Sequence, residues 1–363
     1  MSQKFLKLYL NYRGKYLYIR DIEKNKELFI RAYEWGKKRE KRHFKNLFEK
    51  NHVFLSLTDT CSLNCKHCAL NTSTKVNKID MPYDTVISLI NEIFNAQYKI
   101  LALSGAEPFM YKYFIPLIKY LKNIRHLSTK IWLYTNMQMD IDNEIILDIT
   151  DTFDKIIISI DGCEEEHDAR RGYGSFKKAT NNIKKITINQ RKSEIAIRAT
   201  LTSEQVKNGV ENEIISIAKD VKIKQVLFSK LLPIGRAKEN YINIEKFNEQ
   251  KIDPDFFNKN FIPRNNCGIG SNIQISPNGD IFPCWAMIEN NYKIGNIKDG
   301  FKNILKNYKK RRFFYNNVDN IDKCNSCDVR YICGGVCYAF VNRDCSNIYK
   351  QIIKYLEIAK NNI

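Results

Sequence analysis

Six short apolar runs rich in β-branched residues recur along the middle of the chain, and stretches with apolar residues three and four positions apart lie between them. The runs are residues 53–57, 100–104, 131–134, 156–160, 195–201 and 223–229. The first pattern is typical of buried strands and the second of amphipathic helices. Because strands that alternate with helices form parallel sheets, the sequence predicts an α/β fold with a partial (β/α)6 TIM-like barrel over residues 51–240.

The chain outside the barrel is expected to form three further parts. Over residues 1–50, apolar and polar residues alternate on either side of EKNK, which predicts a separate β-hairpin followed by a basic helix. Residues 241–350 lack the repeat but hold seven of the eleven cysteines, so we expect a loop-rich domain that metal binding stabilises. Residues 351–363 are expected to form a C-terminal helix.

The composition of the chain indicates its cellular compartment and argues against some classes of partner. The sequence shows no signal peptide and no run of about 18 apolar residues, so we expect a cytoplasmic protein without a membrane partner. Cysteine thiols stay reduced in the cytoplasm, so the cysteines are expected to be metal ligands rather than disulfide partners. The net charge is +19, but its lysines are spread along the chain, so nucleic acid is not an expected partner. Residues 37–45, the densest basic run, could face an acidic peptide or RNA, although an exposed surface is the simpler interpretation.

Three cysteines, Cys61, Cys65 and Cys68, follow directly after the first predicted strand. TIM-like barrels place their chemistry at this end of the strands. A structural zinc site would need a fourth ligand, for which His67 is the nearest candidate. Three thiolates instead suit a cubane iron–sulfur cluster in which one iron stays open for a substrate or cofactor.

This spacing, with His67 before the last cysteine, resembles the signature of the radical S-adenosylmethionine (SAM) enzymes. The resemblance implies that the open iron binds the amino and carboxylate groups of SAM, and that one electron cleaves SAM to a 5′-deoxyadenosyl radical. The segment LSGAEP (103–108) is similar to the family's Gly-Gly-Glu-Pro turn. It implies that Ala106, at the second glycine position, and Glu107 line the methionine amino group.

Residues 159–176 resemble a second family pattern, Ser-x-Asp-Gly followed by His-Asp and Arg-Gly. The resemblance implies that Ser159 and Arg171 contact the ribose and the carboxylate of SAM. Cys163 stands where many relatives have proline, just past a barrel strand. It is a candidate catalytic residue, and the competing interpretation is a small buried thiol without chemistry.

The C-terminal cysteines resemble those of the SPASM domain, which implies two auxiliary 4Fe–4S clusters beside the SAM-binding one. By this resemblance one auxiliary cluster is held by Cys324, Cys327, Cys333 and Cys345, and the other by Cys267, Cys284 and Cys337. The second set is one ligand short of four. An open iron, a non-cysteine group or Cys163 could complete it.

Relatives with this domain either oxidise a Cys or Ser in sulfatases or modify ribosomally made peptides. Sulfatase-maturing members carry an aspartate directly after the cysteine that corresponds to Cys284, where this chain has Trp285. The sequence therefore favours an oxidoreductase that crosslinks a ribosomal peptide, by a thioether or another bond, and that receives electrons from a flavodoxin or ferredoxin. The N-terminal hairpin edge is expected to hold the precursor. Sulfatase-type oxidation is the alternative, and an iron–sulfur electron-transfer protein is the alternative of another class.

Overall fold

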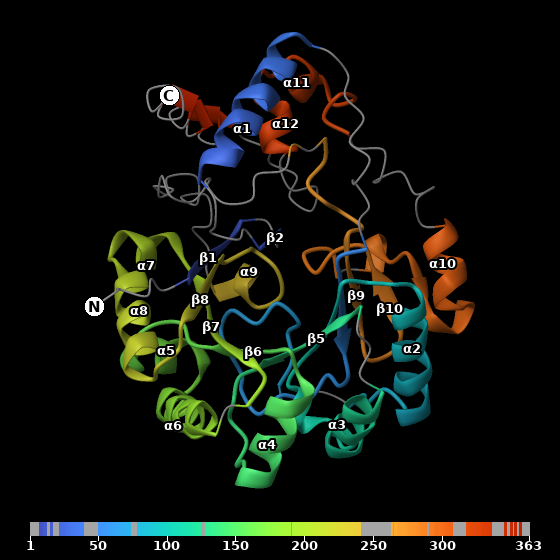
Figure 1. Cartoon of the computed structure of the whole chain (residues 1–363), viewed down its shortest axis with the longest axis vertical. Coiled ribbons are helices and arrows are strands. Elements are labelled where there is room, and N and C mark those ends of the chain that lie inside the picture. The colour runs from blue at the N-terminus through green and yellow to red at the C-terminus, as the bar shows by residue number, and fades with distance from the viewer. Residues whose placement is uncertain are drawn as a thin grey trace.

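The computed structural model describes most of the chain. It covers residues 7–12, 15–16, 22–39, 50–73, 78–124, 128–189, 191–240, 263, 265–288, 290–307, 317–335, 345–346, 349–350, 352–353 and 356–357. Within these ranges, a single sheet with helices along its outer face makes up the larger part of the molecule (Figure 1). No described helix is both long and apolar enough to cross a bilayer.

All six predicted barrel strands are present, and each runs parallel to its neighbours. They are β3 (His52–Ser56), β4 (Ile100–Ser104), β5 (Lys130–Thr135), β6 (Lys155–Ser159), β7 (Glu194–Leu201) and β8 (Gln225–Lys230). The register pairs Val53 with Leu101 and Ser159 with Arg198, so the carboxyl ends of the strands lie at one edge. The predicted α/β fold with a partial barrel is confirmed.

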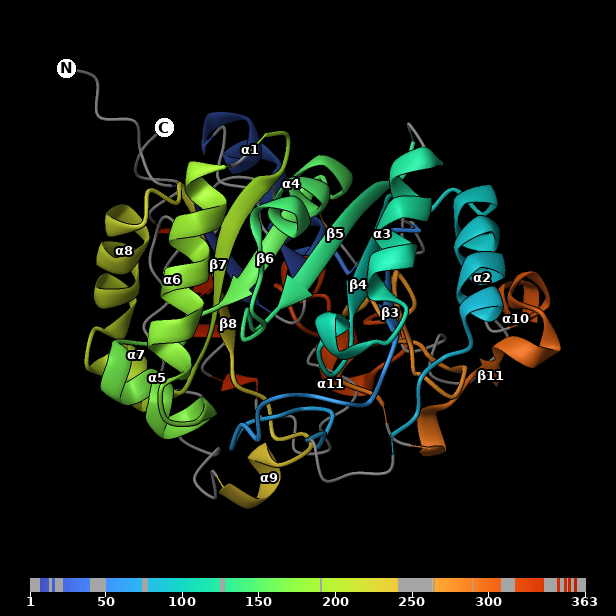
Figure 2. The same cartoon turned by 90° about the horizontal axis from the view of Figure 1, so that it is seen from below.

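Helices cover the outer face of this barrel (Figure 2). They are α2 (Tyr83–Asn95), α3 (Phe114–Asn123), α4 (Asn143–Thr152), α5 (Glu164–Arg171), α6 (Ser175–Ile188), α7 (Ser203–Lys207) and α8 (Val210–Asp220). Each longer helix buries an apolar stripe against the strands; in α2 this stripe includes Val86, Ile90 and Ile93. Outward-facing strand residues such as Val53 and Leu55 are fully buried beneath the helices.

Alternation along the strands fills the inside of the barrel in layers, because successive side chains point to opposite faces. One apolar layer consists of Phe54, Ala102, Trp132, Ile157, Ala196 and Leu227. Two positions further along each strand the inward side chains are mostly polar, namely Ser56, Ser104, Tyr134, Ser159, Arg198 and Ser229. The apolar layer therefore forms a floor below a polar layer at the carboxyl edge.

The N-terminal segment corrects the sequence prediction of a separate hairpin. Strand β1 (Lys7–Tyr12) pairs parallel with β8, and β2 (Lys15–Tyr16) pairs antiparallel with β1. Residues predicted as the rest of the hairpin instead form helix α1 (Ile22–Lys37). The hairpin prediction was wrong because the same apolar residues also fit a helical face, on which Phe29 and Ala32 are buried. Residues 40–49 of the predicted basic helix lie outside the described ranges.

The C-terminal part continues the same sheet on its other side. Strand β9 (Asn272–Ile275) pairs parallel with β3, and β10 (Asp280–Phe282) and β11 (Gly295–Asn296) follow it antiparallel. Short helices complete this part, namely α10 (Phe301–Asn307), α11 (Asp322–Asn325) and α12 (Arg330–Cys333), whereas α9 (Ala237–Asn240) follows β8 and contacts the cysteine loop of the barrel. The described residues between 346 and 357 are helical, and 358–363 of the predicted C-terminal helix lie outside the description.

Helix α1 packs against α12 in a second core, away from the barrel helices (Figure 1). The fully buried Arg330 donates hydrogen bonds to the carbonyl of Gly36, at 2.6 Å, and to Asp319, at 3.1 Å. A Cβ atom on Gly36 would lie 1.7 Å from the carbonyl oxygen of Asp328. The backbones therefore touch at a position where a larger residue does not fit.

Candidate active site

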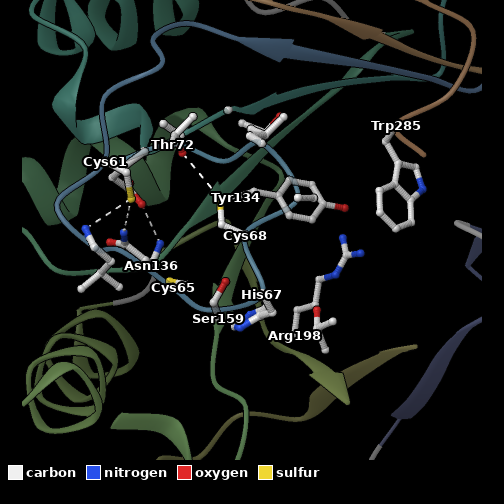
Figure 3. A pocket seen from close by; sticks show the side chains of 18 of the residues that line it. Cys61, Cys65, His67, Cys68, Thr72, Tyr134, Asn136, Ser159, Arg198 and Trp285 are labelled. Atoms are coloured by element: carbon white, nitrogen blue, oxygen red, sulfur yellow. Dashed lines mark hydrogen bonds between the residues drawn. The ribbon is translucent and has the colours of Figure 1, made fainter. Parts of the chain in front are cut away.

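The three cysteines of the first motif lie in the loop after β3, at the carboxyl edge of the barrel. Cys61, Cys65 and Cys68 all line a cavity of about 280 Å³ above the apolar floor (Figure 3). The polar ends of the strands supply the other walls. The site is therefore where parallel barrels place their chemistry.

Arg236 holds this cysteine loop in place from the segment after β8. Its Nε donates to the carbonyl of Cys65 at 2.8 Å, and its Nη2 donates to the carbonyl of Thr72 at 2.9 Å. Its backbone N–H donates to the carbonyl of Cys68 at 3.0 Å. Gly235 permits this approach, because a Cβ there would lie 2.3 Å from the Cys68 oxygen. Sequence reasoning missed both residues; the Gly-Arg pair directly after the last barrel strand was the available signal.

Cys61 has the surroundings of a metal-bound sulfur. Its Sγ accepts hydrogen bonds from Asn136 Nδ2 and from the backbone N–H of Leu63, both at 3.4 Å. Burial raises the pKa of this thiol to about 12, and the nearby Glu107 adds to the shift. Because a buried thiolate needs a neighbouring cation, these contacts suit an iron ligand whose sulfur accepts hydrogen bonds.

Glu107 is fixed in the wall of the cavity by the turn after β4. Gly105 has a φ of +124°, and a Cβ there would lie 2.9 Å from the Cα of Ser56. The Glu107 carboxylate accepts from Thr135 Oγ1 and from the N–H of Asn136, both at 2.7 Å. Burial raises its pKa to about 7. Ala106, the predicted neighbour, also lines the cavity.

Asp161 links two predicted site residues, and sequence reasoning did not assign it a role. It is fully buried after β6 and accepts from Arg171 Nε at 2.5 Å and from His67 Nε2 at 3.2 Å. Although burial favours the neutral acid, the guanidinium of Arg171 holds the pKa of Asp161 well below its usual range. Burial lowers the pKa of His67 to about 4, so this imidazole is neutral. The network joins the cysteine loop to the end of α5.

Ser159 and Cys163, the other two site residues predicted from residues 159–176, lie in different surroundings. Ser159, at the end of β6, lines the cavity together with Arg171. Cys163 directly precedes α5 and is not among the described residues that line the cavity. Its catalytic role stays a prediction.

The described C-terminal cysteines lie in two places, and their assignment to two clusters stays a prediction. Cys324, Cys327 and Cys333 border the second core. Burial raises the pKa of the Cys327 thiol, and Cys333, Asp328 and Cys345 add to this effect. Cys267 and Cys284 instead pack against the barrel core at the base of the β9–β10 hairpin. Cys337 lies outside the described residues.

The C-terminal part also contributes to the cavity. Trp285, directly after Cys284, lines it, as does Gln274 of β9. Gln274 Nε2 donates to Ser56 Oγ at 2.8 Å across the β9–β3 pair. The site is therefore built from both halves of the chain.

Three cysteines on one loop at a barrel cavity, joined to a second cysteine-rich part, are the arrangement expected of an iron–sulfur protein with a cluster at the cavity. Comparison with protein families agrees. Residues 55–208 match the radical SAM superfamily, and residues 267–328 match SPASM, an iron–sulfur cluster-binding domain. The chain thus combines a radical SAM domain with a SPASM domain, and its cofactors are SAM and 4Fe–4S clusters.

Solved structures share this fold. The anaerobic sulfatase maturase anSMEcpe with bound SAM has a TM-score of 0.62 at 19% identity, over 86% of this chain and 100% of that one. SuiB of Streptococcus suis bound to SAM has a TM-score of 0.59 at 17% identity, over 80% and 73%. Pre-heme d1 synthase of Dinoroseobacter shibae is 28% identical over 193 residues, which are 52% of this chain and 45% of the relative. The match thus spans less than half of that relative's length.

Proposed function

We propose that this radical SAM enzyme oxidatively crosslinks a ribosomally made peptide, with a thioether as the preferred product. The observation that carries the proposal is that Trp285 of the SPASM part shares one cavity with Cys61, Cys65 and Cys68. A substrate in this cavity would lie between the SAM-binding cluster and the auxiliary domain. Two relatives of the same fold support a peptide as substrate, because anSMEcpe was solved with the Kp18Cys peptide and SuiB with its precursor peptide SuiA.

The cysteine loop would hold the first cluster through Cys61, Cys65 and Cys68. Asn136 and the backbone of Leu63 would donate to the sulfur of Cys61, and Arg236 would keep the loop closed. When bound, the cluster supplies the electron that cleaves SAM to methionine and a 5′-deoxyadenosyl radical. Ser159 and Arg171 would contact SAM, and Asp161 would fix the direction of the Arg171 guanidinium.

The auxiliary cysteines would serve the same reaction. Cys324, Cys327, Cys333 and Cys345 would hold one cluster, and Cys267, Cys284 and Cys337 the other. Thioether formation would remove a hydrogen atom from a peptide carbon and a proton and an electron from the thiol, and these cysteines would hold the cluster that could take up the electron. A substrate thiolate bound beside Trp285 would be positioned for this step.

Sulfatase-type oxidation is the second candidate, because anSMEcpe shares the fold. Among the described residues that line the cavity, Glu107 is the one carboxylate, and both its oxygens accept hydrogen bonds. The sequence resemblance assigns this carboxylate to the amino group of SAM, so it would not be free to act as a base on the substrate. The described site therefore favours crosslinking over a reaction that needs a free acidic base.

The test begins with SAM cleavage. Anaerobically reconstituted protein with dithionite should produce 5′-deoxyadenosine, and replacing Cys61, Cys65 and Cys68 by alanine should abolish this. Cleavage that survives the triple change would refute the radical assignment. Absent cleavage in protein with intact clusters would favour an electron-transfer protein.

The substrate is tested with the short peptides encoded beside the gene. A crosslinked thioether product should be two hydrogens lighter and should resist thiol alkylation. An unchanged mass, or a product that is alkylated at every cysteine, would rule out the thioether. Oxidation of a sulfatase-derived Cys peptide would favour the second candidate.

A further inference from the structure

Trp285 is a half-buried side chain that lines the cavity and has few contacts with the protein itself. Within the described ranges, its indole takes part in no hydrogen bond, ion pair or ring contact, and it belongs to none of the apolar clusters. Trp132, in the floor of the barrel, is packed instead, with the His52 ring at 5.3 Å and the Lys155 ammonium at 4.9 Å. A large apolar ring that lines a cavity without such neighbours is suited to bind a ligand.

The backbone that carries Trp285 is fixed, although the indole is not packed. The carbonyl of Pro283 accepts a hydrogen bond from the N–H of Gly270 at 2.9 Å, and the carbonyl of Cys284 accepts one from the N–H of Met287 at 3.0 Å. Pro283 and Met287 are themselves buried. The ring is therefore presented to the cavity from a fixed position, which lowers the entropic cost of binding a ligand against it.

The position of Trp285 indicates contact with the substrate rather than with the first cluster. In Figure 3, Trp285 and Cys61 lie on opposite sides of the cavity. Trp285 belongs to the SPASM part, and Cys61 to the radical SAM domain. A ligand that touches the indole would therefore lie between the two parts, where the substrate of the proposed reaction would bind.

The charges around the cavity indicate which kind of group the indole binds. An indole face attracts either a cation or an apolar group. Arg236 also lines the cavity, and its guanidinium donates to backbone carbonyls and to the Asn71 amide oxygen, so no described carboxylate neutralises it. Glu107, the one carboxylate among the described lining residues, already accepts from Thr135 and Asn136. The remaining positive charge disfavours a second cation, so an apolar group is the better ligand.

We propose that Trp285 forms an apolar subsite that selects the substrate. The peptide would pack an aromatic or large aliphatic side chain on the indole, next to the residue that is modified. This inference rests on the proposed function for the peptide nature of the substrate, but the subsite itself can be tested without a peptide.

The first experiment measures which peptides bind to reconstituted, SAM-loaded protein. A pool of random synthetic peptides is incubated with the protein, and bound peptides are identified by mass spectrometry. Wild-type protein should enrich Leu and Phe over Asn and Gln by about tenfold or more, which is the ratio that burial of one such side chain supports. W285F should keep most of this preference, and W285A should lose it. Y173A, which removes a fully exposed aromatic ring outside the cavity, should behave as wild type.

The second experiment observes the subsite directly in SAM-loaded protein. The chain has three tryptophans, so labelling with 5-fluorotryptophan gives three fluorine NMR signals, and W285F identifies the signal of Trp285. N-acetyl-leucinamide should shift this signal, whereas N-acetyl-asparaginamide, which has a similar shape but a polar side chain, should not. The signals of Trp35 and Trp132 are the internal control.

The outcomes separate the subsite from the proposed function. A shift with N-acetyl-leucinamide in protein that binds no peptide would support the subsite and count against the peptide substrate alone. An unshifted Trp285 signal would overturn the subsite, as would a W285A variant that keeps the wild-type peptide preference. The SAM affinity of W285A is measured alongside. A fall in SAM affinity with an unchanged peptide profile would assign the indole to SAM and also overturn the proposal.

Discussion

Arg236 Nε donates a hydrogen bond to the backbone carbonyl of Cys65 across 171 positions of sequence, at a distance of 2.8 Å. This contact ties the segment after the last barrel strand to the loop after the first one. The same guanidinium reaches the carbonyl of Thr72. The shape of the cysteine loop therefore depends on a residue that itself is not a ligand.

Replacing Arg236 by alanine should weaken iron binding, because the loop loses three side-chain hydrogen bonds. Loss of a residue that supports metal ligands typically lowers metal affinity about 10- to 100-fold. Iron retained during titration with a chelator measures the effect, and R191A is the control. Equal retention in the two variants would show that the loop holds its shape without Arg236.

Gly235→Ala should disturb the same loop by collision. The new Cβ would lie 2.3 Å from the Cys68 oxygen and 2.5 Å from the Ala69 oxygen. Gly174 is a matched control, because it also has a positive φ but no atom within 4 Å of its Cβ position. We expect G235A to lose iron and G174A to keep it, although both have backbone strain of about 1 kcal/mol. Similar iron loss in both variants would identify strain, rather than the collision, as the cause.

Asp161→Asn should destabilise the protein strongly. The change leaves the buried guanidinium of Arg171 without its carboxylate, and breaking a buried ion pair typically costs about 3–5 kcal/mol. Denaturant unfolding of the reduced apoprotein measures the loss. D140N, at an exposed carboxylate that pairs with Lys178, is the control and should change little. A D161N curve that overlays the wild-type curve would contradict the role given to this network.

Gly36→Ala should separate α1 from the C-terminal cysteines, because its Cβ would overlap the carbonyl of Asp328. Cys324, Cys327 and Cys333 border the same core, so the auxiliary cluster should be lost first. Three cubane clusters correspond to about twelve irons per chain, and we expect about eight in G36A with SAM cleavage retained. K38A, at an exposed neighbour, should keep the full iron content.

A wild-type content near four irons in well-folded protein would instead contradict both auxiliary clusters. In that case the effect of G36A would have to be measured by unfolding alone. The buried overlap still predicts a lower unfolding midpoint for G36A than for K38A.

Local sequence patterns were enough to predict the barrel strands and the position of the cysteine loop. The alternation of strand and helix patterns predicted all six barrel strands, because each run has to bury its apolar face whatever its neighbours are. The spacing of Cys61, Cys65 and Cys68 was informative for a similar reason, since ligands within eight residues of each other share one loop in any fold. The Gly-Ala-Glu-Pro turn brings Glu107 to the cavity that the three cysteines line, and its contact with SAM stays a prediction.

Only the tertiary structure decided the contacts between distant segments. The pattern of residues 22–37 fits a strand or a helix, and packing of Phe29 and Ala32 against the C-terminal core selects the helix. Asp161 and Arg236 are ordinary charged residues in the sequence, and their roles arise when the carboxyl ends of parallel strands meet at one edge. Periodicity reports which face of a segment is buried, but the folded chain alone determines what lies against that face.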